Sequence, residues 1–326
     1  MAEAVQVVES ARIGPERRRE LAVGVVGCGR LGASLALGLA SAGYRIAAVA
    51  GRGSRRAEGL AEAIPGARAL AAPELVRGSD LILLAVPDDA VAAVAAALPW
   101  RRGQAAVHCA GALDLGPLAP LAARGAARGC LHPLQAFPDP GGSPERGRGI
   151  AVGIEAAEGA GTDLGALLEA LAADLGAGAT VRLEGVDRSC YHAAAVLASN
   201  DVVALAAAAA RAWTLAGLPA SEAPRALGPL LAGAASAVAG LPPGAALASA
   251  LTGPLARGDL ATVARHLDAL AREPSLRALY AALGRELLAL DLGHPPRSAA
   301  ALAALLDGPE GGGTPQARAR PPVEQA

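Results

Sequence analysis

The 326-residue sequence contains no lysine, so every basic side chain other than histidine is an arginine. Any role that requires a lysine amine must therefore fall to another residue type. Aromatic residues account for only 2% of the chain, which predicts a core of small, closely packed side chains. The net charge of −1 gives no reason to expect a nucleic acid as a partner.

Cysteine is also scarce. The four cysteines lack the CxxC spacing of a zinc site, and they are Cys28, Cys109, Cys130 and Cys190. This pattern suggests neither a metal site nor a disulfide framework, and it fits a reducing compartment. The N-terminal segment is polar where a signal peptide would be apolar, and the most apolar long segment, Val202–Trp213, is too short to span a bilayer. We therefore expect a soluble, cytoplasmic protein without a membrane partner.

Two architectures follow one another along the chain. In the first half, apolar runs such as Leu21–Gly27 alternate with segments of helical spacing. This alternation predicts an α/β domain over residues 20–186, with a Rossmann-type, doubly wound, mostly parallel sheet. Residues 187–307 have helical patterns throughout, and Asp187–Gly217 is expected to form one long helix. We expect a flexible arm over residues 1–19 and a disordered tail over 308–326.

A glycine-rich turn follows the first apolar run. Gly27, Gly29 and Gly32 match the pattern G-x-G-x-x-G, with Arg30 and Leu31 inside it. Glycines at these positions permit a tight turn, let the backbone approach a pyrophosphate, and let the helix pack on the strand. The sequence therefore predicts a dinucleotide site at this helix N-terminus. The alternative is a Rossmann-type domain that has lost its cofactor.

Positive charge follows the second predicted strand, where NAD-binding proteins carry an acidic residue. Arg52, Ser54 and Arg55 stand there, and two arginine forks and a hydroxyl suit a 2′-phosphate. This pattern favours NADP(H) over NAD(H). Val86 and Pro87 end a third strand and are expected to pack near the nicotinamide half of the cofactor.

Several segments resemble one family. The stretches "GCLHPLQAF", "CYHAAAVLASNDVVAL" and "LTGPLARGDLATVARHL" are similar to bacterial Rossmann-like proteins with a helical C-terminal domain of the DUF2520 type. The resemblance covers about Leu21–Asp307. It implies an NADP-binding domain of the F420/NADP oxidoreductase-like kind, followed by a helical domain. Beyond the glycine loop, no feature of the sequence points to F420 itself.

The family is in turn similar to pyrroline-5-carboxylate reductases, prephenate dehydrogenases and the β-hydroxyacid dehydrogenase group, which includes ketopantoate reductases. The resemblance therefore implies reduction of a small molecule by NADPH. The β-hydroxyacid group uses a lysine four residues before an asparagine, whereas Val196 stands four residues before Asn200 here. Ala110 also stands where the family's "SGA" has a serine, so this chain lacks any contact made by that hydroxyl.

His132 is the first candidate for the proton donor that such a reduction needs. It follows an apolar run and precedes Pro133, which is expected to end the strand and leave His132 near the cofactor crevice. The alternative is a structural histidine that holds the strand end. Gln135 is expected either to orient a polar substrate or to cap the same turn.

A second group of polar residues falls on the long predicted helix. Arg188, His192 and Ser199 share a narrow stripe at helical spacing, with Asn200 beside it. This stripe predicts the lining of a cleft, in which His192 is the rival proton donor and Asn200 polarises a carbonyl. Tyr191 is expected to lie on another face and to pack.

Two charged residues in "GPLARGD" complete the candidates. Arg257 is expected either to clamp a substrate carboxylate or to take part in a helix cap, and Asp259 is expected to cap the following helix. The remaining histidines are expected to be structural or surface residues, and they are His108, His266 and His294.

These features together predict an NADPH-dependent oxidoreductase that reduces a small 2-oxo acid, with ketopantoate as the preferred candidate. Two alternatives remain, namely an imine reductase of the pyrroline-5-carboxylate type and a non-catalytic NADP(H)-binding sensor. The long alanine-rich helices also predict a homodimer formed through the helical domain.

Overall fold

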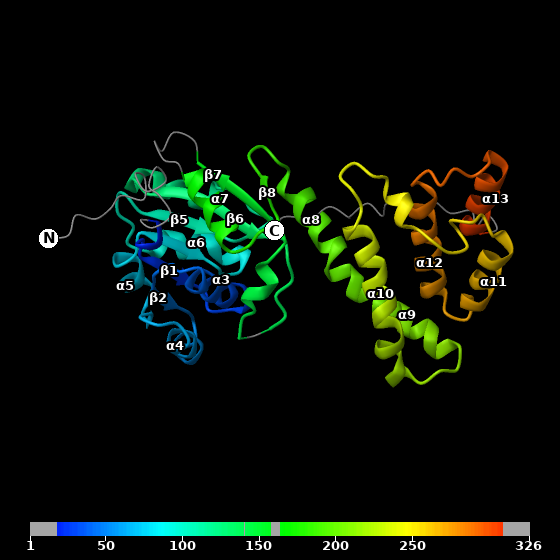
Figure 1. Cartoon of the computed structure of the whole chain (residues 1–326), viewed down its shortest axis with the longest axis horizontal. Coiled ribbons are helices and arrows are strands. Elements are labelled where there is room, and N and C mark those ends of the chain that lie inside the picture. Colours follow the sequence, from blue (N-terminus) through cyan, green and yellow to red (C-terminus); the bar gives the residue numbers. More distant parts are fainter. Residues whose placement is uncertain (1–17, 140, 158–163, 309–326) are drawn as a thin grey trace, which may run out of the picture. The chain divides into compact units, whose positions relative to one another are not determined.

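A computed structural model describes residues 18–139, 141–157 and 164–308. Most of the predicted arm and tail therefore lies outside the described residues. The chain divides into two compact units, Met1–Asp201 and Val202–Ala326, which are considered separately (Figure 1).

The first unit contains an eight-stranded sheet with the order β3-β2-β1-β4-β5-β6-β7-β8. All neighbouring strands are parallel except β6 and β7, which are antiparallel. The first six positions follow the Rossmann order, so the predicted fold class is confirmed. The strands are β1 (Val23–Val26), β2 (Ile46–Ala50), β3 (Arg68–Ala69), β4 (Leu81–Leu84), β5 (Ala105–His108), β6 (Ala127–Pro133), β7 (Ala151–Ala156) and β8 (Ala179–Arg182).

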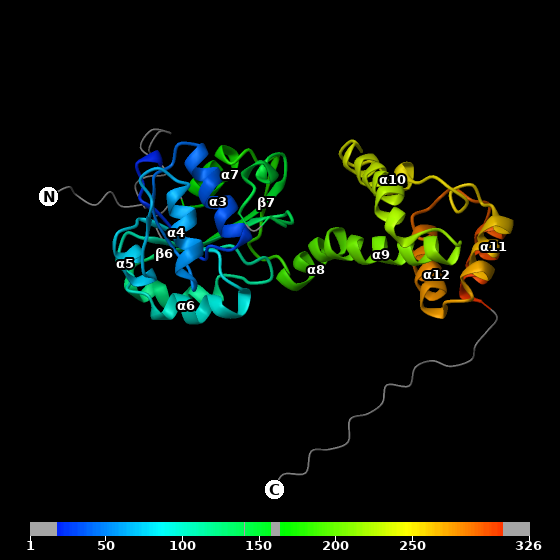
Figure 2. The ribbon, with the colours of Figure 1, turned by 90° about the horizontal axis from the view of Figure 1, so that it is seen from below.

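Helices cover both faces of this sheet because its central strands are apolar on both sides (Figure 2). In β4, Leu81 and Leu83 face one core, and Ile82 and Leu84 face the other. The first core includes α3 (Arg30–Ser41), α4 (Ser54–Glu62) and α7 (Leu164–Asp174). The second includes α5 (Ala72–Arg77), α6 (Val91–Ala97) and the 3₁₀ helix η2 (Gly116–Arg124). Two short 3₁₀ turns, η1 (Asp88–Ala90) and η3 (Pro144–Gly147), lie in loops.

The strand register brings the carboxyl ends of the central strands to one edge. Val26 pairs with Ala50 on one side and with Leu84 on the other, and Leu84 pairs with His108. His108 in turn pairs with Cys130 of β6. The residues that follow these positions therefore share the edge at which such sheets bind ligands.

The single long helix predicted over Asp187–Gly217 is wrong, because the chain breaks at Ser199. Helix α8 (Arg188–Ala198) ends there, with φ −130° and ψ −73° at Ser199, and α9 (Asn200–Leu215) begins immediately afterwards. The Ser199 hydroxyl lies 2.6 Å from the Ala195 carbonyl, a side-chain contact that bends helices. The division between units falls after Asp201, so α8 belongs with the sheet and not with the predicted domain of residues 187–307.

The helix break at Ser199 also affects whether this segment could cross a membrane. An 18-residue window of the stretch Arg188–Leu215 has a mean hydropathy of 1.7 and is by composition apolar enough to cross a membrane. It consists, however, of helices of 11 and 16 residues, whereas a spanning helix needs about 20. This stretch is therefore weak evidence for a membrane helix.

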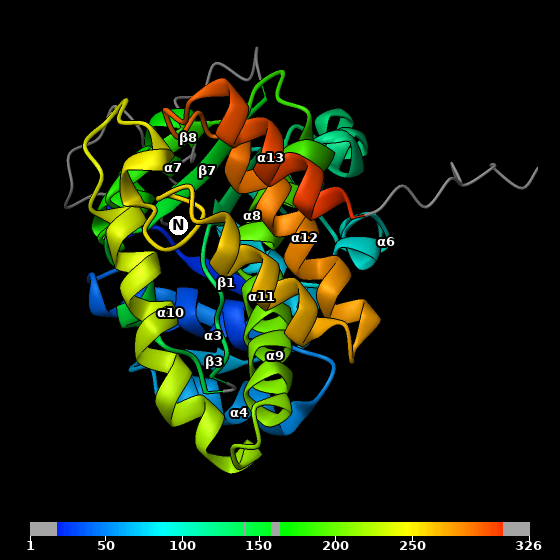
Figure 3. The same ribbon diagram turned by 90° about the vertical axis from the view of Figure 1, so that its right-hand side faces the viewer.

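The second unit is helical, with a core formed by its last three helices. These are α11 (Leu260–Leu270), α12 (Pro274–Leu288) and α13 (Pro296–Asp307), and they follow α10 (Ala223–Ala239) and the short 3₁₀ turns η4 (Ala220–Glu222) and η5 (Leu247–Ala250). Helices α11, α12 and α13 pack against one another (Figure 3). Leu255, Val263 and Leu302 are buried in this core. The Asp259 carboxylate accepts a hydrogen bond from the Thr262 amide at 3.0 Å, so the predicted cap of α11 is present.

Candidate active site

The glycine loop has the geometry that its sequence predicts. Gly27 has a φ of +111°, and a Cβ there would overlap the Ala85 carbonyl. A Cβ on Gly32 would overlap the Gly27 carbonyl, so α3 can approach β1 only at a glycine. Gly29 is the N-cap of α3, is exposed, and has open space where its side chain would be. The turn therefore leaves the N-terminus of α3 accessible to a phosphate.

The residues predicted around the cofactor lie at the same sheet edge. Arg30 is exposed and Leu31 is half-buried in the first turn of α3. Arg52 and Arg55 are exposed after β2 and in the first turn of α4, as a contact with a 2′-phosphate requires. Ser54 is the first residue of α4, and its side chain lies outside the described part of the structure. Val86 is half-buried and Pro87 is exposed directly after β4.

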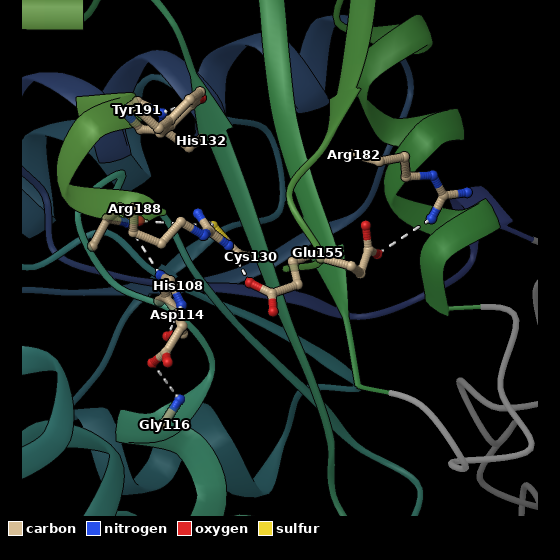
Figure 4. Close-up of polar contacts among 11 residues, drawn as sticks. His108, Asp114, Gly116, Cys130, His132, Glu155, Arg182, Arg188 and Tyr191 are labelled. Atoms are coloured by element: carbon tan, nitrogen blue, oxygen red, sulfur yellow. Dashed lines mark hydrogen bonds and ion pairs between the residues drawn. The ribbon is translucent and has the colours of Figure 1, made fainter. Parts of the chain in front are cut away.

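His132 lies within a strand and not after one, which corrects the expected strand end. Strand β6 continues through Pro133, and His132 pairs with Gly153 across the antiparallel ladder. The Tyr191 hydroxyl lies 2.9 Å from His132 Nδ1 (Figure 4). The prediction that Tyr191 packs on another face is therefore wrong. On a helix, residues i+3 and i+4 both lie above residue i, so Tyr191 and His192 share the side of Arg188.

Arg188 is buried in an ion pair that anchors α8 to the sheet. Its guanidinium contacts the Glu155 carboxylate of β7, and the two side chains are only 6% and 15% exposed. Nη1 lies 3.8 Å from the Cys130 sulfur, and burial raises the pKa of this thiol to about 11 (Figure 4). Glu155 thus balances the charge of Arg188, so this member of the predicted stripe is held by the sheet and is not free to bind a substrate. Loss of either partner would leave an uncompensated buried charge, at a cost of about 3–5 kcal/mol.

Gly111 is the point at which two histidines converge. A Cβ on Gly111 would lie 2.7 Å from His132 Nε2 and 2.9 Å from His192 Nδ1. The two rings are 6.1 Å apart between centroids, at an angle of 62°. His192 Nδ1 is buried without a hydrogen-bond partner among the described residues. The two predicted proton donors, His132 and His192, therefore lie side by side, and both rings pack against Gly111.

The other predicted residues are not part of this cluster. Gln135 is exposed and accepts a hydrogen bond from the Ala136 amide at 2.9 Å, as expected of a residue that caps the turn. The Ser199 hydroxyl lies 3.0 Å from Asn200 Oδ1, and Asn200 is exposed at the start of α9. The helix break therefore separates both residues from the stripe that contains His192. Arg257 is an exposed residue of the second unit.

His108 is a fully buried histidine beneath the cluster. Its Nδ1 accepts a hydrogen bond from the Ala110 amide at 3.3 Å, and its Nε2 lies 3.0 Å from the Asp114 carbonyl. The carbonyl can only accept, so the proton is on Nε2. Burial lowers the pKa of His108 to about 4. Burial, together with the charges of His192, Arg188 and His108, also lowers the pKa of His132 to about 4.

Acidification is therefore expected to destabilise the first unit. Above pH 6.5 both histidines are neutral in the folded and unfolded chain, and between pH 6.5 and about 4 only the unfolded chain takes up the protons. Stability is thus complete above pH 6.5 and is lost as the pH falls toward 4, by on the order of 3 kcal/mol for each histidine.

Urea unfolding of a Trp213→Phe variant, followed by the fluorescence of Trp100, would measure this loss in the first unit alone. The variant that also carries His108→Gln should lose about half as much stability on acidification. An unfolding free energy that is equal at neutral and acidic pH would contradict the expected burial of these two neutral histidines.

Family and structure comparisons agree with this architecture. A Rossmann-like domain family matches residues 7–133, and the DUF2520 family, described as a domain of unknown function, matches residues 150–287. No curated protein matches the sequence.

Three solved structures illustrate the likeness. A Thermotoga maritima protein is 26% identical, with a TM-score of 0.65, 82% of this chain covered and 98% of that one. A Bacteroides fragilis protein, named as a candidate NADP oxidoreductase, is 25% identical, with a TM-score of 0.62 and coverages of 83% and 98%. A 1-pyrroline-5-carboxylate reductase from Streptococcus pyogenes is 17% identical, with a TM-score of 0.58 and coverages of 82% and 98%, and it shows the shared fold.

The strand order and the two family matches agree: the chain contains a segment that matches a Rossmann-like domain, followed by a segment that matches the DUF2520 domain.

Proposed function

We propose that the protein is an NADPH-dependent reductase of a small molecule. The main support for this proposal is that the predicted cofactor site and the histidine cluster occupy one edge of the sheet. The glycine loop and the cluster of His132, Tyr191 and His192 lie at the same carboxyl edge of the sheet. Exposed Arg52 and Arg55 would hold the 2′-phosphate, and the N-terminus of α3 would hold the pyrophosphate. The bound nicotinamide would supply a hydride, and the 25% identity to a candidate NADP oxidoreductase supports this assignment.

A small 2-oxo acid, with ketopantoate first, is the proposed substrate. Its carbonyl oxygen acquires negative charge during reduction, and the ring nitrogens of His132 and His192 that converge over Gly111 can donate to such an oxygen. Arg188 is already paired with Glu155, so it is not available to bind the substrate carboxylate.

A cyclic imine of the pyrroline-5-carboxylate kind is the second candidate, and the state of His132 favours it. With a pKa of about 4, His132 is neutral at physiological pH and is not an imidazolium acid. A protonated imine is already electrophilic and needs no proton from the enzyme.

Steady-state oxidation of NADPH by the purified full chain would test both candidates. The panel would contain ketopantoate, two other 2-oxo acids, and 1-pyrroline-5-carboxylate, each also assayed with NADH. Turnover with any of them and NADPH supports a reductase, and the preferred compound identifies the class. NADPH binding without turnover of the whole panel would instead favour a sensor.

We also propose that the enzyme is a homodimer formed through α9 and α10. Within the chain these helices bury only Ala208 and Ala223, whereas Val203 and Leu230 are 71% and 72% exposed. Large exposed apolar faces of this kind mark protein interfaces. Sedimentation velocity should give a dimer for the wild type and a monomer for the double variant Val203→Glu, Leu230→Glu. A monomeric wild type at micromolar concentration would contradict the proposal.

All four cysteines are free, and three of them are buried. Free thiols are typical of a reducing compartment, which supports the proposal that the enzyme works in the cytoplasm.

A further inference from the structure

The hydrogen bond between Tyr191 and His132 is built into the packing of the first unit. Gly153, the cross-strand partner of His132, leaves the space that the tyrosine hydroxyl occupies, since a Cβ there would lie 2.5 Å from it. The two rings meet edge to face, with centroids 5.6 Å apart. The hydroxyl is thus directed at Nδ1 by α8, which the buried ion pair of Arg188 and Glu155 anchors.

This contact decides which nitrogen of His132 carries the proton. A phenol is a far stronger acid than a neutral imidazole N–H, so the stronger arrangement has the Tyr191 hydroxyl donating to Nδ1. The proton of the neutral ring is then on Nε2. Among the described residues no hydrogen bond reaches Nε2, and it lies over Gly111 beside Nδ1 of His192.

A neutral imidazole has a difficulty as a proton donor. If His132 gave up its Nε2 proton alone, it would become an imidazolate, which is far too basic to form readily. The imidazolium form is also disfavoured, because His132 is half-buried and lies near the ionisable groups of His192, His108 and Arg188. A neutral His132 can therefore act only if a second proton reaches Nδ1 as the first one leaves.

We propose that Tyr191 is the positioning residue that fixes the Nε2–H form of His132 and replaces the proton that His132 delivers to the substrate oxygen. This inference rests on the proposed reduction of a 2-oxo acid by NADPH. When the hydride adds to the carbonyl carbon, the π pair moves to oxygen. An O–H bond forms as the His132 Nε2–H bond breaks, and the Tyr191 proton moves to Nδ1.

The step yields the alcohol, a neutral His132 protonated on Nδ1, and a Tyr191 phenolate. Nε2 then takes a proton from water while the Nδ1 proton returns to the phenolate, which restores the starting state. Burial raises the pKa of Tyr191 to about 12, so the hydroxyl keeps its proton at rest, while the nearby charge of Arg188 stabilises the phenolate. We call this transfer of protons from Tyr191 through His132 to the substrate oxygen the relay. The ion pair of Arg188 and Glu155 takes part in it, because Arg188 stabilises the phenolate.

Tyr191→Phe is the kinetic test, because it removes the relayed proton and leaves the ring. We expect kcat with the 2-oxo acid to fall by about 100-fold, the usual lower range for loss of general acid catalysis. Turnover of a cyclic imine that arrives protonated should change little, and the Kd for NADPH should be unchanged. If Tyr191 had only a structural role, the variant would lose activity with the 2-oxo acid and with the cyclic imine to the same extent.

Tyr280→Phe provides a matched control in the second unit. The Tyr280 hydroxyl lies 2.9 Å from His266 Nδ1, with ring centroids 5.7 Å apart. Tyr280→Phe therefore removes an equivalent contact between a tyrosine hydroxyl and a histidine, away from the proposed active site. This variant should retain wild-type kcat with both substrates. Equal losses with ketone and imine in Tyr191→Phe, or a wild type that reduces imines only, would overturn the relay.

A second measurement does not depend on turnover and therefore separates the relay from the proposed function. Nitrogen-15 NMR of the histidine-labelled full chain, with His132 assigned from a His132→Gln variant, reports which ring nitrogen is protonated. The relay requires the Nε2–H form in the wild type and a shift toward a mixture of tautomers in Tyr191→Phe. An Nδ1–H form in the wild type would overturn the relay even if NADPH-dependent reduction is confirmed.

Discussion

Replacing Arg52 by Asp and Arg55 by Ala is expected to reverse the cofactor preference from NADPH to NADH. Both side chains are exposed at the start of α4, so their removal leaves the fold intact. Each charge-assisted hydrogen bond to the 2′-phosphate contributes about 1.5–3 kcal/mol, and loss of one arginine should therefore weaken NADPH binding by about 10–100-fold. The new carboxylate at position 52 would accept hydrogen bonds from the ribose diol of NADH and repel the phosphate of NADPH.

Fluorescence titration of the reduced nicotinamide would give Kd for both cofactors in the wild type and in the double variant. Arg56→Ala is the matched control, because Arg56 is also exposed in the first turn of α4 but is not among the residues proposed to hold the 2′-phosphate. This control should bind NADPH as the wild type does. A double variant that still prefers NADPH would show that the 2′-phosphate is held by other residues.

Gly111→Ala is expected to abolish most of the activity through a single added methyl group. The Cβ would lie 2.6 Å from His132 Cε1 and 2.9 Å from His192 Nδ1, so at least one ring must move. The backbone of Gly111 has no left-handed conformation, so the effect is steric and not conformational. Displacement of a catalytic group by about 1 Å can cost about 100-fold in rate, which is the loss expected in kcat.

The Kd for NADPH should be nearly unchanged in this variant, because the glycine loop and the two arginines follow β1 and β2, whereas Gly111 follows β5. Gly59→Ala is the control, since a Cβ at Gly59 on α4 meets open space. It should retain full activity. Wild-type kcat in Gly111→Ala would mean that the convergence of the two histidines has no part in the reaction.

The features that the sequence predicts correctly are local ones. The tight turn of the glycine loop and the cap at Asp259 are each contained in a few consecutive residues, so spacing alone is sufficient to recognise them. The sheet is predicted well for the same reason, since each apolar run is bounded by turn residues.

The features that the sequence misses depend on contacts between distant segments. The antiparallel pairing of β6 with β7 places Gly153 beside His132, and Glu155 of β7 contacts Arg188. No local pattern in the sequence indicates that pairing. A signal was nevertheless present, because the lone carboxylate in the apolar run "IAVGIEA" requires a partner if the strand is buried. The long helix breaks at Ser199, whose hydroxyl donates to the Ala195 carbonyl, and an ideal helical projection cannot show such a break.

The central claim is that this chain transfers hydride from NADPH to a carbonyl or imine carbon at the site of His132. The most direct measurement mixes the wild-type chain with deuterium-labelled NADPH and each compound of the substrate panel, and then analyses the product by mass spectrometry. The proposed function predicts one deuterium on the former carbonyl or imine carbon with NADPH, and far slower labelling with labelled NADH. NADPH that binds but transfers deuterium to no compound of the panel, or label that transfers equally well from NADH, would contradict this account.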